Sequence, residues 1–268
     1  MHAEYTKSRR EATRPTSGVH AGLQLVGLAV AAMAIYWLGN REFDAGRGDL
    51  FYLADAFLRG RGDIAVQLGP YDVIRLNGQV FVPFPPFPAI VLMPLVAAVG
   101  PVTADQWESG INAALAACVV ALGWWVAGRL GVERMRDRFA LVLLLGFSTP
   151  VWWVTTRGGV WHTGHLIALL ISLAVVAELW GRRRPLLLGL LIGAGFLTRP
   201  PLAFVGPAVA LWYLLERSVK PEPRSWPRPP LPARAWAMLV AGFAPALGFF
   251  LAYNALRFGS PIESGYGL

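Results

Sequence analysis

Four side chains that could take part in chemistry share one side of a short predicted helix: Asp49, Tyr52, Asp55 and Arg59. At about 100° per residue, the apolar side chains between them fill the opposite arc, so we expect a helix over residues 49–59 at a membrane surface. Asp49 falls in the first turn, where the helix dipole favours a carboxylate, and Gly60 is placed to end the helix. An i,i+4 ion pair accounts for Asp55 and Arg59, which leaves Asp49 available for chemistry.

Two histidines and an arginine are further candidates. His162 and His165 stand at i,i+3, a spacing that suits two metal ligands or a substrate contact on one helix face, and equally suits interfacial hydrogen bonding beside Trp161. Arg199 interrupts an apolar region that otherwise runs from residue 185 to 215. A cation at that depth must reach water or an anion, so snorkelling at a helix end and phosphate binding both remain open.

The composition indicates what must position these residues. The chain has 268 residues, of which 55% are hydrophobic and 15% charged, and its mean hydropathy is +0.49. We therefore predict an all-α integral membrane protein, because a barrel would show short alternating segments. The excess of 24 Lys and Arg over 16 Asp and Glu lies in short loops beside apolar segments, which favours membrane topology over nucleic-acid binding. The single cysteine, Cys118, cannot form an internal disulfide.

Basic gaps predict the orientation of the apolar segments, which cover residues 23–38, 87–102, 111–127, 139–155, 160–180, 185–197, 202–215 and 235–256. Cytoplasmic loops are rich in Lys and Arg, and this marks the basic tail over residues 1–22, the gaps 129–138 and 182–184, and the proline-rich loop 217–234. If every segment crossed, the gap 182–184 would fall outside. The short, proline-bearing segment 87–102 is the one expected not to cross, as a surface or re-entrant helix.

This reading predicts a polytopic bundle of about 7 spans in the inner (plasma) membrane, with a cytoplasmic N-terminus. A transmembrane domain covers residues 23–268, and residues 40–110 form a first extracytoplasmic loop with surface helices over 49–59 and 87–102. Asp44 and Asp49 then face the volume enclosed by the outer loops. The alternative, in which segment 87–102 crosses and residues 185–215 form one tilted crossing, stays open.

Three stretches, taken together, resemble a known family: GDLFYLADAFLRG with NGQVFVPFPPFPAIVLMP, then LLGLLIGAGFLTRPPLAF, then YNALRFGSPIESGYG. In order and spacing they are similar to the polytopic GT-C glycosyltransferases, in particular to bacterial members like the protein mannosyltransferases and the aminoarabinose transferase of lipid A. The resemblance covers most of the chain from about Leu23 onward. Such enzymes are usually longer, so we expect this chain to be an N-terminal portion.

The resemblance implies transfer of a sugar from a polyprenyl-phosphate donor to an extracytoplasmic glycan, lipid or protein acceptor, with inversion at the anomeric carbon. Asp49, Tyr52 and Ala56 match the family pattern of an acid followed by Tyr and Ala. Asp49 is the first choice of catalytic general base and Asp44 the second. Many relatives carry paired acids here, whereas this chain has Gly48 before Asp49.

The same resemblance implies the substrate contacts. Arg199 follows Thr198 as in the family's motif near the lipid phosphate, where a cation would stabilise the departing group. His162 and His165 stand where relatives often carry a second acid, and a divalent metal ion is left open as a cofactor. The expected substrate-binding residues are Tyr52, His162, His165, Arg199, Arg257, Glu263 and Tyr266.

Two other classes of function remain. One is a non-catalytic membrane subunit, or a remnant of such an enzyme. The other is a transporter or flippase for lipid-linked substrates, since intramembrane arginine and broken helices also serve transport. Against transport, the ionisable groups gather on the predicted outer face, and no inverted repeat is visible in the sequence.

Overall fold

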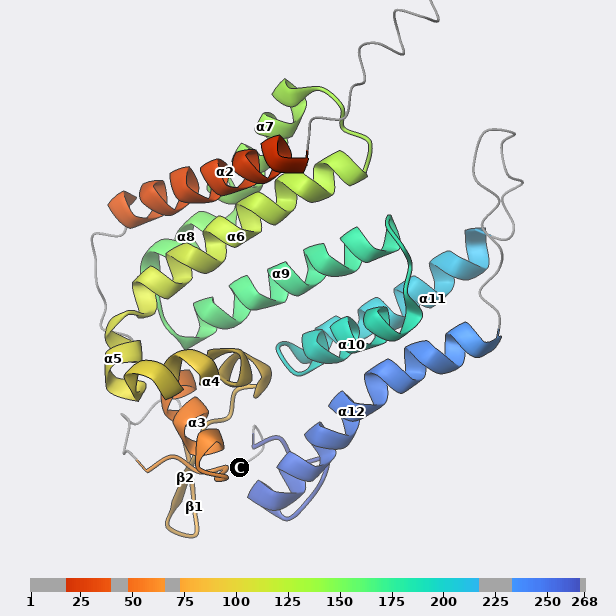
Figure 1. Ribbon diagram of the computed structural model, residues 1–268. Helices are drawn as coiled ribbons and strands as arrows, with labels where there is room; N and C mark the ends of the chain where they lie inside the picture. Colours follow the sequence, from red (N-terminus) through yellow and green to blue (C-terminus); the bar gives the residue numbers. More distant parts are fainter. Residues whose placement is uncertain (1–17, 40–47, 66–72, 217–232, 266–268) are drawn as a thin grey trace, which may run out of the picture.

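The computed structural model describes residues 18–39, 48–65, 73–216 and 233–265. They form a bundle of helices with one small β-hairpin at its end (Figure 1). The basic tail expected over residues 1–22 lies mostly outside the described residues, and the first described helix, α2, begins inside it at Gly18.

Four described helices are long and apolar enough to cross a membrane: α2 (Gly18–Gly39), α6 (Glu108–Arg129), α9 (Val160–Leu179) and α12 (Ala233–Phe258). A fifth candidate is a bent pair, α7 (Met135–Phe147) with α8 (Pro150–Arg157), whose axes differ by 48°. The chain is thus an all-α protein of the membrane type, with up to five candidate spans among the described residues. The expected count of about 7 is not confirmed.

The bend between α7 and α8 has a local cause. Pro150 has no N–H to continue the ladder of α7, and Thr149 caps the new helix because its Oγ1 accepts a hydrogen bond from Val151 N at 3.3 Å. The same hydroxyl donates to Leu145 O at 2.6 Å. The apolar segment predicted over residues 139–155 is therefore two helices.

Residues 185–216 also form short helices: α10 (Pro185–Phe196), the 3₁₀ helix η1 (Pro200–Phe204) and α11 (Val205–Glu216). A helix of 12 residues such as α10 rises about 18 Å, less than the roughly 30 Å of a hydrocarbon core. The chain turns at Arg199, and η1 and α11 pack back against α10 (Figure 1). Residues 185–216 are thus not one continuous helix.

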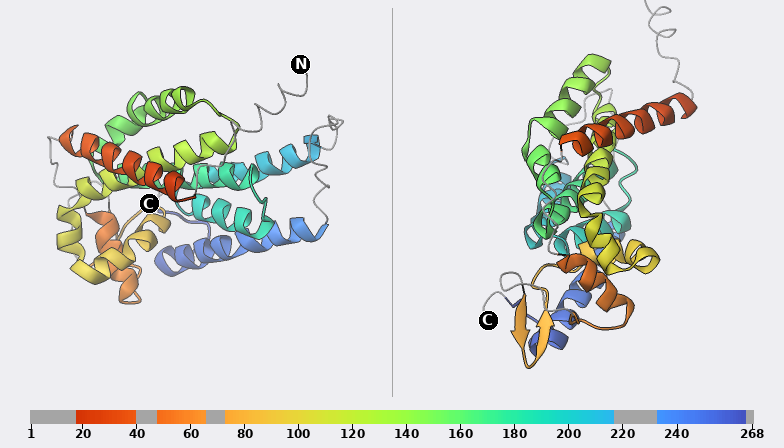
Figure 2. Two further views of the ribbon diagram at one scale, coloured as in Figure 1. Left: turned by 45° about the horizontal axis from the view of Figure 1, so that its top comes forward. Right: turned by 90° about the vertical axis from the view of Figure 1, so that its left-hand side faces the viewer.

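The remaining elements form a loop module at one end of the bundle, made of α3 (Asp49–Leu58), β1 (Ile74–Leu76), β2 (Gln79–Phe81), α4 (Phe87–Val99) and α5 (Pro101–Gln106) (Figures 1 and 2). The strands pair antiparallel, with Ile74 opposite Phe81, around Asn77 and Gly78 at positive φ. The core of the module is apolar and consists of Leu50, Phe51, Leu53, Ala54, Ala56, Ile64, Val82, Phe84, Ala89, Leu92, Val96 and Ala104, joined by Val160 of α9.

Helix α4 is the segment expected not to cross. It packs on α3 and ends at Gly100, whose φ of 80° turns the chain into α5. Its first residue, Phe87, donates its N–H to Leu197 O at 3.0 Å, which joins the loop module to the end of α10. The views agree that α4 stays with α3 and α5 at one end of the bundle, while the α6–α7 and α9–α10 turns lie at the other (Figures 1 and 2).

Two glycines bring α10 and α12 into backbone contact. A Cβ atom on Gly189 would lie 2.1 Å from Leu239 O, and one on Gly242 would lie 2.3 Å from Leu186 O. Small residues at a crossing let the backbones of membrane helices approach closely. Such packing matters because lipid supplies no hydrophobic force to press the helices together. This crossing fixes α12 against the rest of the bundle.

Candidate functional site

Asp49 is buried where the loop module meets the bundle. It is the first residue of α3 and its side chain is 1% exposed. The carboxyl group of Asp105, on α5, lies against the residue before it, because a Cβ atom on Gly48 would be 2.7 Å from Asp105 Cγ. A side chain at position 48 would require the Asp105 carboxyl group to move, since that carboxyl group, from another helix, occupies the space.

A third carboxyl group completes the cluster. Glu108 begins α6 and is 4% exposed, and the charges of Asp105 and Asp49 both act on it. Thr163, on α9, lies 3.4 Å from Glu108 Oε1 and donates its hydroxyl proton to Asn112 Oδ1 at 2.8 Å. We call Asp49, Asp105 and Glu108 the acid cluster.

Burial sets the protonation behaviour on the loop-module side of the cluster. It raises the pKa of the Asp105 carboxyl above its ordinary range, since charge is disfavoured away from water. Burial also raises the pKa of the Tyr52 phenol, with a smaller contribution from the Asp105 charge. Asp105 therefore holds a proton more readily than an exposed aspartate, and Tyr52 stays a neutral hydrogen-bond donor.

Arg199 is held on the other side of α9. Its Nη2 donates to Trp161 O at 2.8 Å and contacts His165 Nδ1 at 2.9 Å, and its guanidinium lies 5.1 Å from the centre of the Trp161 ring. His165 Nδ1 also contacts the carbonyl oxygen of Trp161, so Arg199, His165 and Trp161 form one group of mutual contacts. The predicted cation is thus oriented by the first turns of α9.

The two histidines do not act as a pair. His162 packs edge-on against Trp153, with ring centres 5.0 Å apart, whereas His165 contacts Arg199. Within the described residues no group of three His, Cys, Asp or Glu side chains is placed to hold a metal ion.

The beginning of α9 is common to both sets of residues. Thr163 contacts the acid cluster, while Trp161 and His165 contact Arg199. Phe84 packs edge-on against the Trp161 ring, with centres 5.0 Å apart, so the proline-rich run after β2 covers this turn. A buried acidic group and an oriented cation are therefore fixed to one short helical segment.

The other predicted residues have separate places. Arg257 is 7% exposed and donates to Val82 O at 2.8 Å and Asn254 Oδ1 at 2.9 Å. Glu263 accepts a hydrogen bond from Gly265 N at 2.7 Å, a local turn contact. Asp44 and Tyr266 lie outside the described residues.

The expected pair of Asp55 and Arg59 is confirmed. Arg59 Nε and Nη2 donate to the two carboxylate oxygens at 2.9 and 3.1 Å, and the Arg59 side chain is 66% exposed. Both residues therefore lie on the open side of α3, away from the acid cluster.

Sequence reasoning missed Asp105, Glu108, Asn112 and Thr163. Each stands close to the predicted boundary of an apolar segment, where polar residues are ordinary. The available signal was that Asp105 and Glu108 stand three apart, one helical turn, at the entrance to a membrane helix. Their convergence on Asp49 depends on tertiary packing.

No family model, curated protein or solved structure matches this chain.

Proposed function

We propose that this chain carries the catalytic site of a membrane glycosyltransferase that moves a sugar from polyprenyl phosphate to an extracytoplasmic hydroxyl or amine. The supporting observation is that the beginning of α9 contacts both the acid cluster and Arg199. Such a transfer needs a base for the acceptor and a cation for the leaving phosphate, fixed relative to one another.

Asp49 is the proposed base. It stands at the N-terminus of α3, where the helix dipole favours the ionised form. Asp105, whose pKa is raised by burial, is the better candidate to keep a proton. Neighbouring carboxyl groups in different environments commonly divide acid and base roles in this way.

The proposed reaction breaks the bond between the anomeric carbon and the phosphate oxygen and forms one to the acceptor oxygen or nitrogen. Asp49 takes the acceptor proton, and the phosphate leaves with the electron pair, so an attack from the opposite face inverts the anomeric carbon. Arg199 would stabilise the growing negative charge on the phosphate. Because Trp161 O and His165 hold its guanidinium, little reorganisation is needed at the moment of reaction.

The finer features belong to the same proposal. Tyr52, His162 and His165 would contact substrate near the acid cluster and Arg199, and Asp44, Arg257, Glu263 and Tyr266 remain proposed from the family resemblance. A bundle of about 7 spans in the inner membrane, with the loop module outside the cytoplasm, would bring a lipid-linked donor and a water-soluble acceptor to one site.

The test is sugar transfer by membranes containing the full chain, supplied with a panel of radiolabelled polyprenyl-phosphate sugars. We expect Asp49→Asn to lower the transfer rate about 100-fold or more, the usual contribution of a general base. Asp55→Asn is the matched control, because Asp55 pairs with the exposed Arg59 on the open side of α3.

Equal transfer by the Asp49→Asn and wild-type proteins would contradict the role of Asp49. Wild-type membranes that move labelled lipid between leaflets, but never transfer the sugar, would instead identify a transporter.

A further inference from the structure

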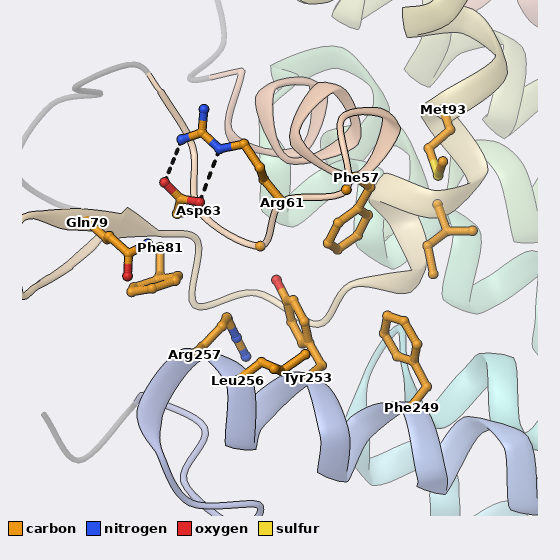
Figure 3. Close-up of a pocket in the computed structure, with 13 residues that line it drawn as sticks. Phe57, Arg61, Asp63, Gln79, Phe81, Met93, Phe249, Tyr253, Leu256 and Arg257 are labelled. Carbon is orange, nitrogen blue, oxygen red and sulfur yellow. Dashed lines mark hydrogen bonds and ion pairs between the residues drawn. The ribbon is translucent and has the colours of Figure 1, made fainter.

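A cavity of about 470 Å³ lies between the loop module and α12 (Figure 3). Pockets that bind small molecules span about 300 to 1,000 Å³. The C-terminal end of α3, the loop after it, β2, α4 and α12 supply its walls. Its apolar lining residues are Phe57, Phe81, Ile90, Met93, Phe249 and Leu256.

One buried hydroxyl group points into this cavity. Tyr253 is 6% exposed, and its hydroxyl has no hydrogen-bond partner among the described residues. In Figure 3 the hydroxyl points toward the space between Phe57 and Arg61. A buried hydroxyl without a partner is unfavourable, so a ligand atom that hydrogen-bonds to it would be bound specifically.

Neighbouring groups hold the Tyr253 ring in place. Phe249 stacks on it and Phe57 meets it edge-on, each with ring centres 5.6 Å apart. The Arg257 guanidinium lies 3.8 Å from the ring centre. A positive charge beside the ring polarises the hydroxyl and makes it the better donor, which favours an acceptor oxygen as its partner.

The other charged groups on the wall neutralise one another. Arg61 donates through Nη2 to Asp63 Oδ2 at 2.6 Å and through Nε to Oδ1 at 3.2 Å. The carboxylate is therefore satisfied by its own neighbour. An occupant meets mostly apolar and aromatic surface, and the remaining polar side chains of the lining are Tyr253, Gln79 and Arg257.

The position of the cavity indicates the source of its occupant. Helix α12 is a candidate membrane span, and only 11% of its most apolar window is buried inside the protein. Leu256 lines the cavity and is 87% exposed, so the cavity opens on a surface that would face the bilayer. Lipid chains are the apolar molecules present at that surface.

We propose that this cavity binds the chain of a bilayer lipid, with an ester or phosphate oxygen of that lipid accepting a hydrogen bond from Tyr253. The site is distinct from the acid cluster, since Phe57 and Asp49 are about 12 Å apart along α3. The proposal stands on the cavity, the Tyr253 hydroxyl and the exposure of α12, and it does not depend on glycosyl transfer.

The test uses the full chain in proteoliposomes that contain phosphatidylcholine with a diazirine group on one acyl chain. After illumination, mass spectrometry locates the crosslinked peptides. We expect crosslinks within residues 249–257 of α12 and around Met93 of α4. Tyr253→Phe removes only the hydroxyl, and we expect it to weaken lipid binding about fivefold, as the loss of one hydrogen bond would.

Met93→Trp should fill the cavity and remove most of the crosslinks. Leu247→Trp is the matched control, because Leu247 lies on α12, is 40% exposed and does not line the cavity. Thermal unfolding of each variant checks that it is folded. The proposal would be overturned if Tyr253→Phe and Met93→Trp gave as much crosslinking as Leu247→Trp. It would also be overturned if no crosslinks formed in either segment.

Discussion

At the scale of single residues, the acid cluster shows how one environment assigns different properties to chemically similar groups. Asp49 is the first residue of α3, at the positive end of that helix, whereas Asp105 belongs to α5 and its carboxyl group lies against Gly48. Burial raises the pKa of Asp105, because the charged form is disfavoured away from water. Asp63, by contrast, has a lowered pKa because Arg61 donates hydrogen bonds to it.

These opposite shifts predict opposite dependences of stability on pH. The Asp105 pKa is raised in the folded protein, so its contribution is full below the ordinary aspartate pKa of about 3.9 and is lost as pH rises through the folded value. Asp105→Asn should therefore unfold at a higher temperature relative to wild type as pH rises from about 4 to about 8.

The measurement is thermal unfolding in detergent across that range. Asp63→Asn is the contrasting variant: the lowered pKa of Asp63 stabilises the fold above the ordinary aspartate pKa, and that contribution is lost as pH falls through the folded value. Removing Asp63 should thus cost stability at neutral pH. Parallel pH profiles for the two variants would contradict both assignments.

At the scale of elements, the crossing of α10 and α12 depends on glycine. A side chain on Gly189 or Gly242 would strike backbone atoms of the opposite helix, which cannot rotate away as a flexible side chain could. We expect Gly242→Ala to separate the helices and to destabilise the protein by about 1 to 3 kcal/mol, the usual range for overpacking.

Gly248→Ala on the same helix is the control, because a Cβ atom there meets nothing within 4 Å. It should leave stability unchanged or raise it by a few tenths of a kcal/mol, since alanine favours helix over glycine. Thermal unfolding of both variants gives the comparison. A Gly242→Ala protein as stable as Gly248→Ala would show that the helices do not pack as closely as the structure has them.

The same elements show what local sequence predicts. The helix expected over residues 49–59 is α3, Asp49–Leu58, and Gly60 follows it with a φ of 69°. The Asp55 to Arg59 pair forms as expected. Helix periodicity, the end of a helix at glycine and i,i+4 pairing involve residues a few positions apart, so they can be predicted without knowledge of the fold.

The rest required tertiary structure. Angular position placed Asp49 on the polar side of α3, yet α5 packs against that helix and Asp49 is buried. Hydropathy showed one apolar run over residues 139–155, but Pro150 divides it. Arg257 was selected as a cation for substrate, and its main-chain partner, Val82 O, is 175 residues away. Contacts over such separations leave no local pattern.

At the scale of the whole molecule, the loop module lies at one end of the bundle, and the α6–α7 and α9–α10 turns lie at the other (Figures 1 and 2). The proposed orientation places the first end outside the cytoplasm and the second inside. A cysteine scan tests this, starting from Cys118→Ala, because Cys118 is the only cysteine in the chain.

In that background, Arg59→Cys should react with a membrane-impermeant maleimide in intact cells, since Arg59 is exposed on the loop module. Glu133→Cys, in the turn between α6 and α7, should react only after the cells are permeabilised. Labelling of both positions from the same side, or the reverse pattern, would refute the orientation.

The contact between Arg257 and Val82 O also has a consequence for the order of folding. The ribosome makes about 5 to 20 residues per second, so the 175 residues between these partners take about 9 to 35 s to synthesise. During that interval the hairpin and the run after it must persist without their anchor on α12. The loop module is therefore expected to settle late, and until then the edges of its two strands are open to pairing with other chains.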